Sequence, residues 1–262
     1  MFPFRNILFP DDSSVNAEAA LKYATAFAQY GHGRVVSLSV QDAKEIGQAV
    51  ADHDIDLLTV ALRDRNLLTR AFGSSLAEDI IAESPCAVLA VRPPQRDFVN
   101  GQSEIELKRV LLATNFRPSS VAATQLATQM SNQLGAELHA VYVIGDYFEQ
   151  ISVMFPEGGL AALTRLRSYV QERMAQLARG CGATHIAEGR PYQEIVKLAD
   201  TLQADLIVIG TAVHGSLFGS SQVLGSEIER VIRNAPCPVL CVPAARVVTP
   251  LPALVTQIVP QT

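Results

Sequence analysis

Short apolar runs alternate with amphipathic stretches along the chain. The apolar runs are rich in Val, Leu and Ile, and three of them lie at 35–40, 138–143 and 206–209. Continuous apolar runs are typical of strands that are covered on both faces. Between them, the stretches 16–30 and 121–134 carry apolar residues at spacings of three and four, the period of an α-helix, and each ends at a glycine, a common helix stop. The alternation predicts an α/β fold with parallel strands joined by right-handed crossovers.

Distant blocks of the chain recur in the same order, which indicates an internal duplication. The matching pairs are 5–12 with 108–115, 72–80 with 224–231, and 84–91 with 235–242. The copies differ in length, because 61 positions separate Asp12 from Gly73 whereas 110 separate Asn115 from Gly225. The additional residues include a predicted helix from about 160 to 177, a strand near 185–187 and a helix from 193 to 202. We therefore expect two tandem domains, the first of them shortened by one helix–strand unit.

Proline and glycine mark the boundary between the two domains. Residues 93–104 contain Pro93, Pro94 and Gly101, and this composition is typical of a linker. We expect an N-terminal domain over 1–94, a C-terminal domain over 105–246 and a tail over 247–262.

Charge and hydropathy exclude several functional classes. The formal net charge is −5 and the Lys and Arg residues are scattered, which argues against a nucleic-acid partner. No apolar run approaches the roughly 18 residues of a membrane span. The first residues lack the basic end and the long apolar stretch of a signal peptide. We therefore expect a cytoplasmic protein that does not enter a membrane.

Sequence motifs for catalysis and metal binding are missing. The four cysteines show no Cys-x-x-Cys spacing, and the five histidines show no metal-ligand spacing. Neither a P-loop nor a Gly-x-Ser-x-Gly elbow occurs. Cys86 and Cys237 each follow a proline and open an apolar run, so we expect them to be buried in strands. We therefore predict neither catalytic nor metal-ligating residues.

Three features, in this order, resemble the universal stress protein family. The first strand leads into Pro-Asp-Asp-Ser at 10–13, a glycine-rich stretch follows the run 206–209, and Ala-Pro-Cys-Pro-Val-Leu occupies 235–240. The resemblance covers nearly the whole chain as two tandem units. It implies two flavodoxin-like open parallel sheets flanked by helices, of the adenine nucleotide alpha hydrolase-like kind, and a role in stress responses. Family members often dimerise through the last strand, which implies a pseudo-dimer within the chain and allows a homodimer through 238–242.

Some members of that family bind ATP or AMP through Gly-x-x-Gly, nine further residues, and Gly-Ser or Gly-Thr. Here nine residues separate Gly215 from Gly225, and Ser226 follows at the start of a predicted helix. Glycines let the backbone approach phosphate, and a helix N-terminus offers unpaired N–H groups. The first glycine of the motif would fall on Ala212, whereas Gly210 ends the preceding strand, so the loop is two residues longer than the family pattern.

The resemblance also assigns residues at the ends of two other strands. Ala113, Thr114 and Asn115 end the first strand of the second unit, and Asn115 stands where the family has an aspartate near the adenine and ribose. Val143 aligns with the family residue whose backbone contacts adenine. In the first unit most of the glycine loop is lost and Asp64 would repel a phosphate, so we expect no nucleotide there.

These features leave three functions open. The first is a stress-response module that binds ATP or AMP in the C-terminal domain, with Mg²⁺ accompanying ATP. The second is a nucleotide-independent interaction or scaffold protein, favoured by the long loop and by Asn115. The third is a slow ATP hydrolase or nucleotidyl-transfer enzyme, although Glu227 and Glu229, in the first turn of a predicted helix, are typical complements of the helix dipole. We expect the first function, without a defined chemical reaction.

Overall fold

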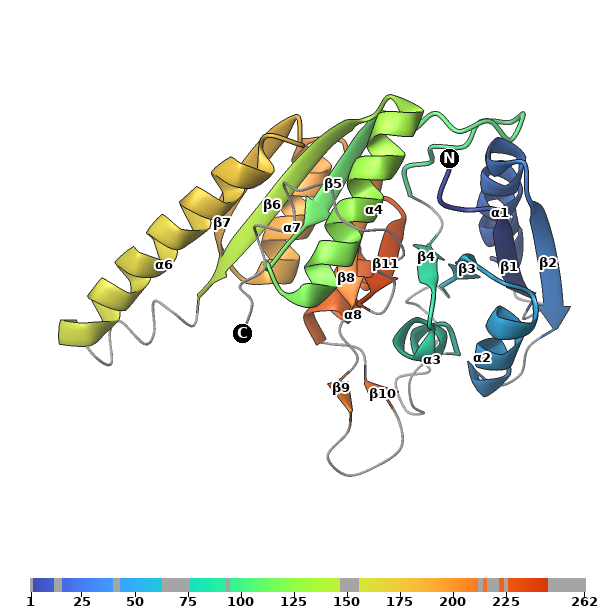
Figure 1. Cartoon of the computed structure of the whole chain (residues 1–262), viewed down its shortest axis with the longest axis horizontal. Helices are drawn as coiled ribbons and strands as arrows, with labels where there is room; N and C mark the ends of the chain where they lie inside the picture. The colour runs from blue at the N-terminus through green and yellow to red at the C-terminus, as the bar shows by residue number, and fades with distance from the viewer. Residues whose placement is uncertain are drawn as a thin grey trace.

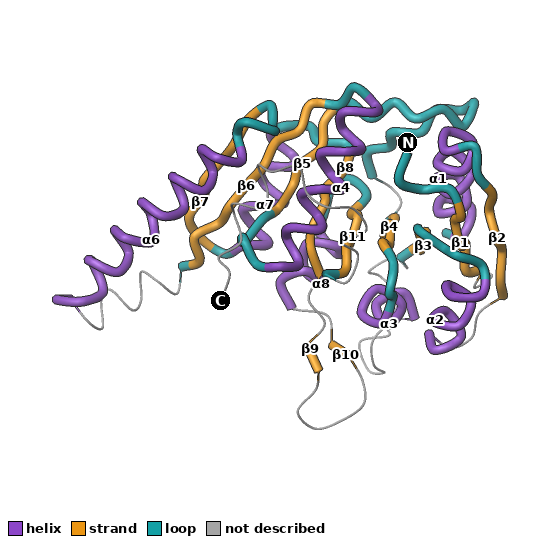
Figure 2. Tube along the Cα trace, viewed as in Figure 1, coloured by secondary structure: helices purple, strands orange, loops and turns teal. Residues whose placement is uncertain are grey.

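One mixed sheet forms the centre of the molecule, and helices cover both of its faces (Figure 1). Figure 2 shows the same layers, with helices on either side of the strands. The computed structural model describes residues 2–11, 16–39, 43–62, 76–92, 95–146, 156–211, 214–215, 222–223 and 226–244.

The helices and strands alternate in both halves of the chain, as the apolar pattern predicts. In the first half they are β1 (Asn6–Asp11), α1 (Ala17–Gly31), β2 (Arg34–Ser39), α2 (Ala43–Asp52), β3 (Leu57–Ala61), α3 (Leu76–Glu83) and β4 (Ala87–Val91). In the second half they are β5 (Arg109–Ala113), α4 (Pro118–Leu134), β6 (Glu137–Gly145), α6 (Pro156–Leu177), β7 (Ala183–Gly189), α7 (Pro191–Thr201), β8 (Leu206–Thr211), β9 (His214–Gly215), β10 (Gln222–Val223), α8 (Ser226–Asn234) and β11 (Val239–Pro243).

The two predicted sheets merge into one nine-stranded sheet. Its order is β2-β1-β3-β4-β11-β8-β5-β6-β7, and all neighbours are parallel except β4 and β11. At this antiparallel seam Leu240 lies opposite Leu89, and Val239 lies opposite Ala90. The two halves therefore form the expected pseudo-dimer within one chain. Because β11 pairs with β8 along its other edge, it has no edge left for a second chain, and the alternative of a homodimer through 238–242 is wrong.

The first half contributes four strands to the large sheet and the second half contributes five. The outermost strand of the second half, β7, has no counterpart in the first half, which confirms the predicted loss of one helix–strand unit. The additional helix, strand and helix predicted for the second copy correspond to α6, β7 and α7. The predicted tail over 247–262 lies outside the described residues.

Different helices cover the two faces of the sheet. Helices α1, α4 and α6 pack on one face, and α2, α3, α7 and α8 pack on the other. Every residue of the central strands β4 and β11 is buried, as expected for continuous apolar runs between two helical layers. The edge strand β7 is only partly buried.

The segment between the halves is docked against both of them. Asp97 forms an ion pair with Lys22 of α1 and accepts a hydrogen bond of 2.9 Å from the hydroxyl of Tyr23. On the other side, Arg96 donates to the carbonyl oxygens of Ala199 and Ala204 at the end of α7, at 3.3 and 3.4 Å. The segment therefore connects α1 of the first half with α7 of the second.

All four cysteines are free thiols. Cys86 and Cys237 are buried, as predicted, and Cys241 is buried as well. Burial is the main cause that raises the pKa of Cys241, to about 12. The thiols of Cys86 and Cys237 are also buried in the core, on the face that α7 and α8 cover. Cys241 lies in β11, whereas Cys86 and Cys237 lie just before β4 and β11, so their predicted placement within strands is wrong. All three serve as small apolar residues of the core.

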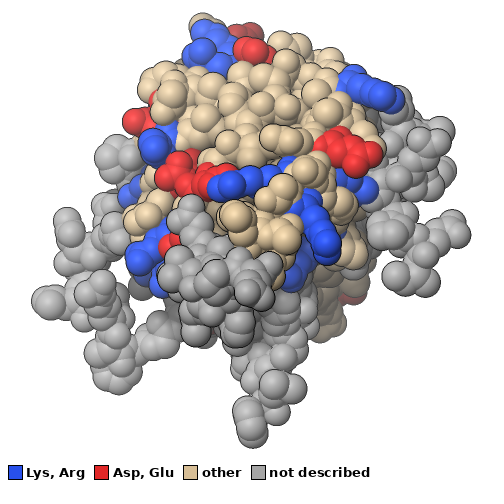
Figure 3. All heavy atoms as spheres, turned by 90° about the vertical axis from the view of Figure 1, so that its left-hand side faces the viewer, with Lys and Arg blue, Asp and Glu red and all other residues tan. Residues whose placement is uncertain are grey.

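Charges of both signs are mixed on the flank formed by α6 and β7. On the face drawn in Figure 3, basic and acidic side chains alternate without forming one large patch of either sign. Arg167 of α6 donates two hydrogen bonds to Glu188 of β7, at 2.9 and 2.7 Å. Among the helices of the described ranges, none combines the length and the apolar character that a membrane span requires.

Candidate functional site

The strand order reverses at β5. The chain passes from β5 to β6 on one side, whereas the later strand β8 pairs with β5 on the other side. In open α/β sheets, ligands bind in the crevice outside the carboxyl ends of the strands at such a reversal. Ala113 ends β5 opposite Val141 and Ile209, so Val143 and Gly210 lie just beyond it on the neighbouring strands. The fold thus brings these three predicted site residues to one edge of the sheet.

The turn from β5 into α4 uses the side chain of Asn115. Its Oδ1 accepts a hydrogen bond of 2.6 Å from Oγ of Ser120 and one of 3.1 Å from the N–H of Arg117. Thr114 is buried, and its N–H donates to the carbonyl of Val141 at 2.9 Å, which extends the ladder by one residue. The Nδ2 group is therefore the remaining polar group of the exposed Asn115 side chain, because its oxygen is engaged at the start of α4.

Phe116 locks this turn against α6. Its φ of 58° is left-handed, an uncommon conformation for a residue with a large side chain. The ring of Phe116 stacks on the ring of Tyr142 of β6, with 5.0 Å between the ring centroids. The guanidinium of Arg173, a residue of α6, lies 5.2 Å from the centroid of the Phe116 ring. The aromatic contacts and the cation–π contact hold the strained residue in place. Nothing in the sequence pattern singled out Phe116 or Arg173.

The backbone of Val143 faces the crevice. Alternate residues of a strand direct their N–H and C=O groups to opposite neighbours. Since the carbonyl of Val141 accepts from Thr114 on the β5 side, the backbone groups of Val143 point to the same side. Strand β5 ends before it reaches this position. One donor and one acceptor are therefore directed into the space beyond β5, where a planar heterocycle could pair with them.

Gly210 is required by packing. A Cβ added at this position would lie 2.3 Å from the carbonyl oxygen of Ser119 and 2.8 Å from the N atom of Ser120. The end of β8 can therefore approach the first turn of α4 only because residue 210 lacks a side chain. This contact accounts for the glycine without a ligand.

Two helix N-termini meet on the α7/α8 face beside the crevice. The N–H of Tyr192, in the first turn of α7, donates to Oε2 of Glu227 in the first turn of α8 at 3.1 Å. Arg230 lies 3.2 Å from Oε1 of the same carboxylate. Glu227 thus caps α7 and pairs with a cation, which agrees with the expected electrostatic role of an acidic residue at a helix start.

The predicted glycine loop is described at three points. Gly215 lies in β9 and pairs with Gln222 of β10 in a two-stranded antiparallel ribbon, which no sequence pattern predicts. The ribbon extends from the second half toward the first, and β10 contacts α3 (Figure 1). Ser226 begins α8, as predicted, whereas Gly225 lies outside the described residues.

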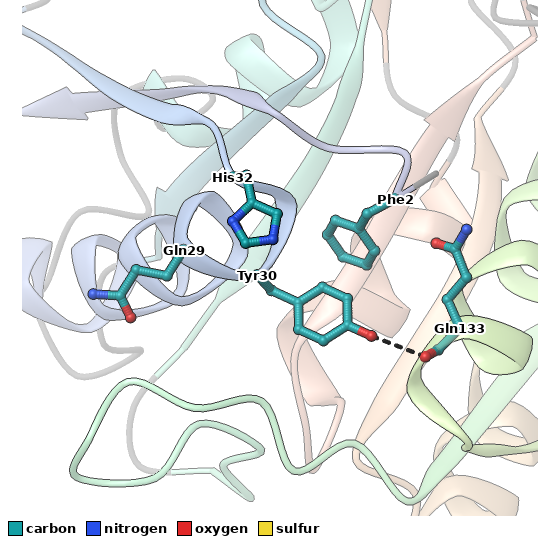
Figure 4. Close-up of a pocket in the computed structure, with 5 residues that line it drawn as sticks. All are labelled: Phe2, Gln29, Tyr30, His32 and Gln133. Atoms are coloured by element: carbon teal, nitrogen blue, oxygen red, sulfur yellow. Dashed lines mark hydrogen bonds between the residues drawn. The ribbon is translucent and has the colours of Figure 1, made fainter.

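A separate hollow of about 490 Å³ lies at the opposite edge of the sheet (Figure 4). It is lined by residues that precede β1 or end α1 and α4: Phe2, Gln29, Tyr30, His32 and Gln133. The hydroxyl of Tyr30 donates to the carbonyl of Gln133 at 2.9 Å and so joins the two halves. Because α1 and α4 end where β2 and β6 begin, this hollow adjoins the amino ends of the strands and is not part of the crevice.

No group of three or more His, Cys, Asp and Glu in the described ranges lies close enough together to hold a metal ion. Glu227 is already engaged by α7 and by Arg230.

A family model and two related proteins assign the chain to the same family. The model of the universal stress protein family matches residues 32–92 and 106–243, which is most of the chain. A universal stress protein of Methanocaldococcus jannaschii is 33% identical over 145 residues, which are 52% of this chain and 81% of that protein. A second universal stress protein, of Thermus aquaticus, is 33% identical over 138 residues, which are 52% of this chain and 98% of that protein.

Solved structures share the fold across both halves. A functionally unknown protein of Pseudomonas aeruginosa PAO1 superimposes with a TM-score of 0.66 and 16% identity, over 97% of this chain and 95% of that one. A universal stress protein of Archaeoglobus fulgidus superimposes with a TM-score of 0.63 and 18% identity, over 92% of this chain and 97% of that one. At these identities the likeness concerns the fold alone.

Proposed function

Because the chain belongs to the universal stress protein family, we propose that it is a cytoplasmic stress-response module whose second half binds ATP or AMP. The proposed site is the crevice beyond the carboxyl ends of β5, β6 and β8. We assign no chemical reaction to it, because a hydrolase would need a free base to orient water. Both carboxylates in the first turn of α8 are engaged: Glu227 is held by Tyr192 and Arg230, and Glu229 pairs with Arg233.

The strand reversal at β5 is the observation that carries this proposal. It creates a crevice beyond the strand ends, and the proposed glycine loop leads from β8 into the N-terminus of α8, a feature that favours anions. The backbone of Val143 would pair with the adenine ring, and Nδ2 of Asn115 would donate to the ribose. Gly215, Gly225 and Ser226 would surround the phosphates at the start of α8.

The proposal is tested by identifying what the purified chain carries. Mass spectrometry of ligand released on denaturation should detect ATP or AMP at close to one per chain. Titration calorimetry on the stripped protein should then show binding that Gly225→Val abolishes, because the branched side chain would occupy space that a phosphate needs. Gly101→Val is the matched control, since Gly101 is exposed and its added Cβ meets no atom within 4 Å. No released nucleotide, together with no heat at millimolar ATP or AMP, would refute the proposal.

A second candidate function is protein interaction that does not depend on a nucleotide. The observation that favours it is the engagement of Asn115, whose side-chain oxygen already accepts two hydrogen bonds within the protein. A ligand would gain only the Nδ2 donor from this side chain. A partner that binds equally well with and without ATP would support this second function.

A further inference from the structure

Arg230 lies in a bridge between α7 and α8. Its Nη1 donates to Oε1 of Glu227 at 3.2 Å, while Oε2 of Glu227 accepts from the N–H of Tyr192 at 3.1 Å. The guanidinium of Arg230 also lies 5.3 Å from the centroid of the Tyr192 ring. Three side chains thus connect the first turns of two helices that are adjacent in space but 35 residues apart in sequence.

The bridge orients a guanidinium that still has free donors. An arginine side chain carries five N–H donors, and within the described part of the chain only Nη1 of Arg230 makes a hydrogen bond. The side chain is 54% exposed, so the remaining N–H groups are accessible from solvent. The carboxylate and the ring restrict the guanidinium before any ligand arrives, which reduces the entropy lost when a ligand binds.

Two other arginines near the starts of these helices pair with different carboxylates. Arg233 pairs with Glu229 at 2.9 Å one turn further along α8, and Arg190 lies 3.7 Å from Asp146 before α7. The charge of Glu227 would repel a phosphate at the start of α8, but Arg230 neutralises it. Arg230 therefore balances Glu227 and, with only Nη1 engaged among the described residues, can still offer donors to an anion.

The direction of the side chain agrees with this role. Side chains on an α-helix lean toward its N-terminus, so Arg230 reaches back toward the first turn of α8. This is the turn at which the proposed function places the phosphates. A planar guanidinium can bind two phosphate oxygens at once, whereas an ammonium group acts as a point charge.

We propose that Arg230 binds the phosphates of the nucleotide and makes the site select ligands by phosphate charge. The inference rests on the proposed function and extends it, because it predicts the order ATP, then AMP, then adenosine. Tyr192 and Glu227 act as positioning residues: they hold the guanidinium and do not contact the ligand.

Calorimetric titration of the full chain with ATP, AMP and adenosine tests this role. In Arg230→Gln the Kd for ATP should rise by about 10- to 100-fold, as expected for the loss of a hydrogen bond between charged groups. The Kd for AMP should rise less, and that for adenosine should not change. Arg230→Lys should bind ATP with intermediate affinity. Arg233→Gln is the control and should bind all three ligands like the wild type.

Each alternative outcome is distinguishable. An equal loss of affinity for ATP and adenosine in Arg230→Gln would show that Arg230 only holds α7 and α8 together, and would overturn the inference. Unchanged ATP affinity in a folded Arg230→Gln protein would overturn it as well. If the wild-type chain binds none of the three ligands, the proposed function itself fails, and the inference fails with it.

Discussion

The hydroxyl of Ser120 donates a hydrogen bond of 2.6 Å to Oδ1 of Asn115, five residues earlier in the chain. The same oxygen accepts from the N–H of Arg117, and Oγ of Ser120 in turn accepts from the N–H of Asn115 at 3.1 Å. These bonds cap the start of α4, whose N-cap residue Arg117 provides no side-chain cap of its own. Asn115 therefore has a structural role at the edge of the proposed site.

We expect Asn115→Ala to lower the free energy of unfolding by about 1 kcal/mol, the usual cost of removing a capping side chain. Asn115→Asp should not show this loss, because a carboxylate accepts the same two hydrogen bonds and its charge is favourable at the start of α4. Urea denaturation at neutral pH measures both changes. Equal destabilisation by the two substitutions would show that the capping bonds do not stabilise the turn.

Gly210→Ala should destabilise the protein by about 2 kcal/mol, because the new methyl group would clash with the first turn of α4. Gly47→Ala is the matched control. Gly47 lies exposed in α2 and an added Cβ meets no atom within 4 Å, so this change should stabilise the protein by about 0.5–1 kcal/mol through helix propensity. The midpoint temperature of thermal unfolding should fall in Gly210→Ala and rise in Gly47→Ala. A shift of both midpoints in the same direction would contradict the packing role of Gly210.

The regular elements could be predicted because they depend on local patterns. The apolar spacing over 16–30 indicated the helix that is observed as α1, Ala17–Gly31, and the run 206–209 indicated β8. The internal repeat indicated two tandem copies and the helix–strand unit that the first copy lacks, observed as α6 and β7 in the second half. The pattern did not specify the neighbours of the last strand, β11. An apolar run does not show that β11 will pair with β8 along one edge and with β4 of the other half along the second edge.

Parts of the site could not be predicted, because they depend on contacts between residues that are distant in sequence. The ribbon of β9 and β10 consists of two-residue strands, which are too short to show any periodicity. The contact between Glu227 and Tyr192 becomes visible only when α7 and α8 are packed together. Asn115 was identified as a site residue, but the engagement of its oxygen depends on the geometry of the turn.

Arg96 should contribute to the docking of the two halves. Its Nη1 donates to two carbonyl oxygens at the end of α7, and its Nη2 pairs with Asp200. We expect Arg96→Gln to lower the free energy of unfolding by about 2 kcal/mol, since the hydrogen bonds involve a charged donor. Asp200→Asn should cost about 0.5 kcal/mol or less, because the side chain of Asp200 is 68% exposed and the ion pair is screened by water. If urea denaturation gives the same loss of unfolding free energy for Arg96→Gln and Asp200→Asn, the hydrogen bonds from Arg96 to the two carbonyl oxygens do not contribute to stability.

A histidine pair on β6 and β7 should make stability depend on pH. Nδ1 of His139 lies 3.2 Å from Nε2 of His185, and Nε2 of His139 lies 3.2 Å from Oε1 of Glu137. Burial, and secondarily the charge of His139, lower the pKa of His185 from its usual value. The hydrogen bond between the two rings requires one donor and one acceptor, so the pair resists a second positive charge.

The sign of the pH effect follows from this lowered pKa. The unfolded chain binds a proton at His185 near the usual pKa of about 6.5, whereas the folded chain binds it only at lower pH. The contribution of His185 to stability is therefore present above pH 7, decreases as the pH falls through 6.5, and levels off below the folded pKa. Urea denaturation should show that the free energy of unfolding decreases less between pH 7.5 and pH 5.5 in His185→Gln than in the wild type. Identical pH profiles for the two proteins would contradict a lowered pKa at His185.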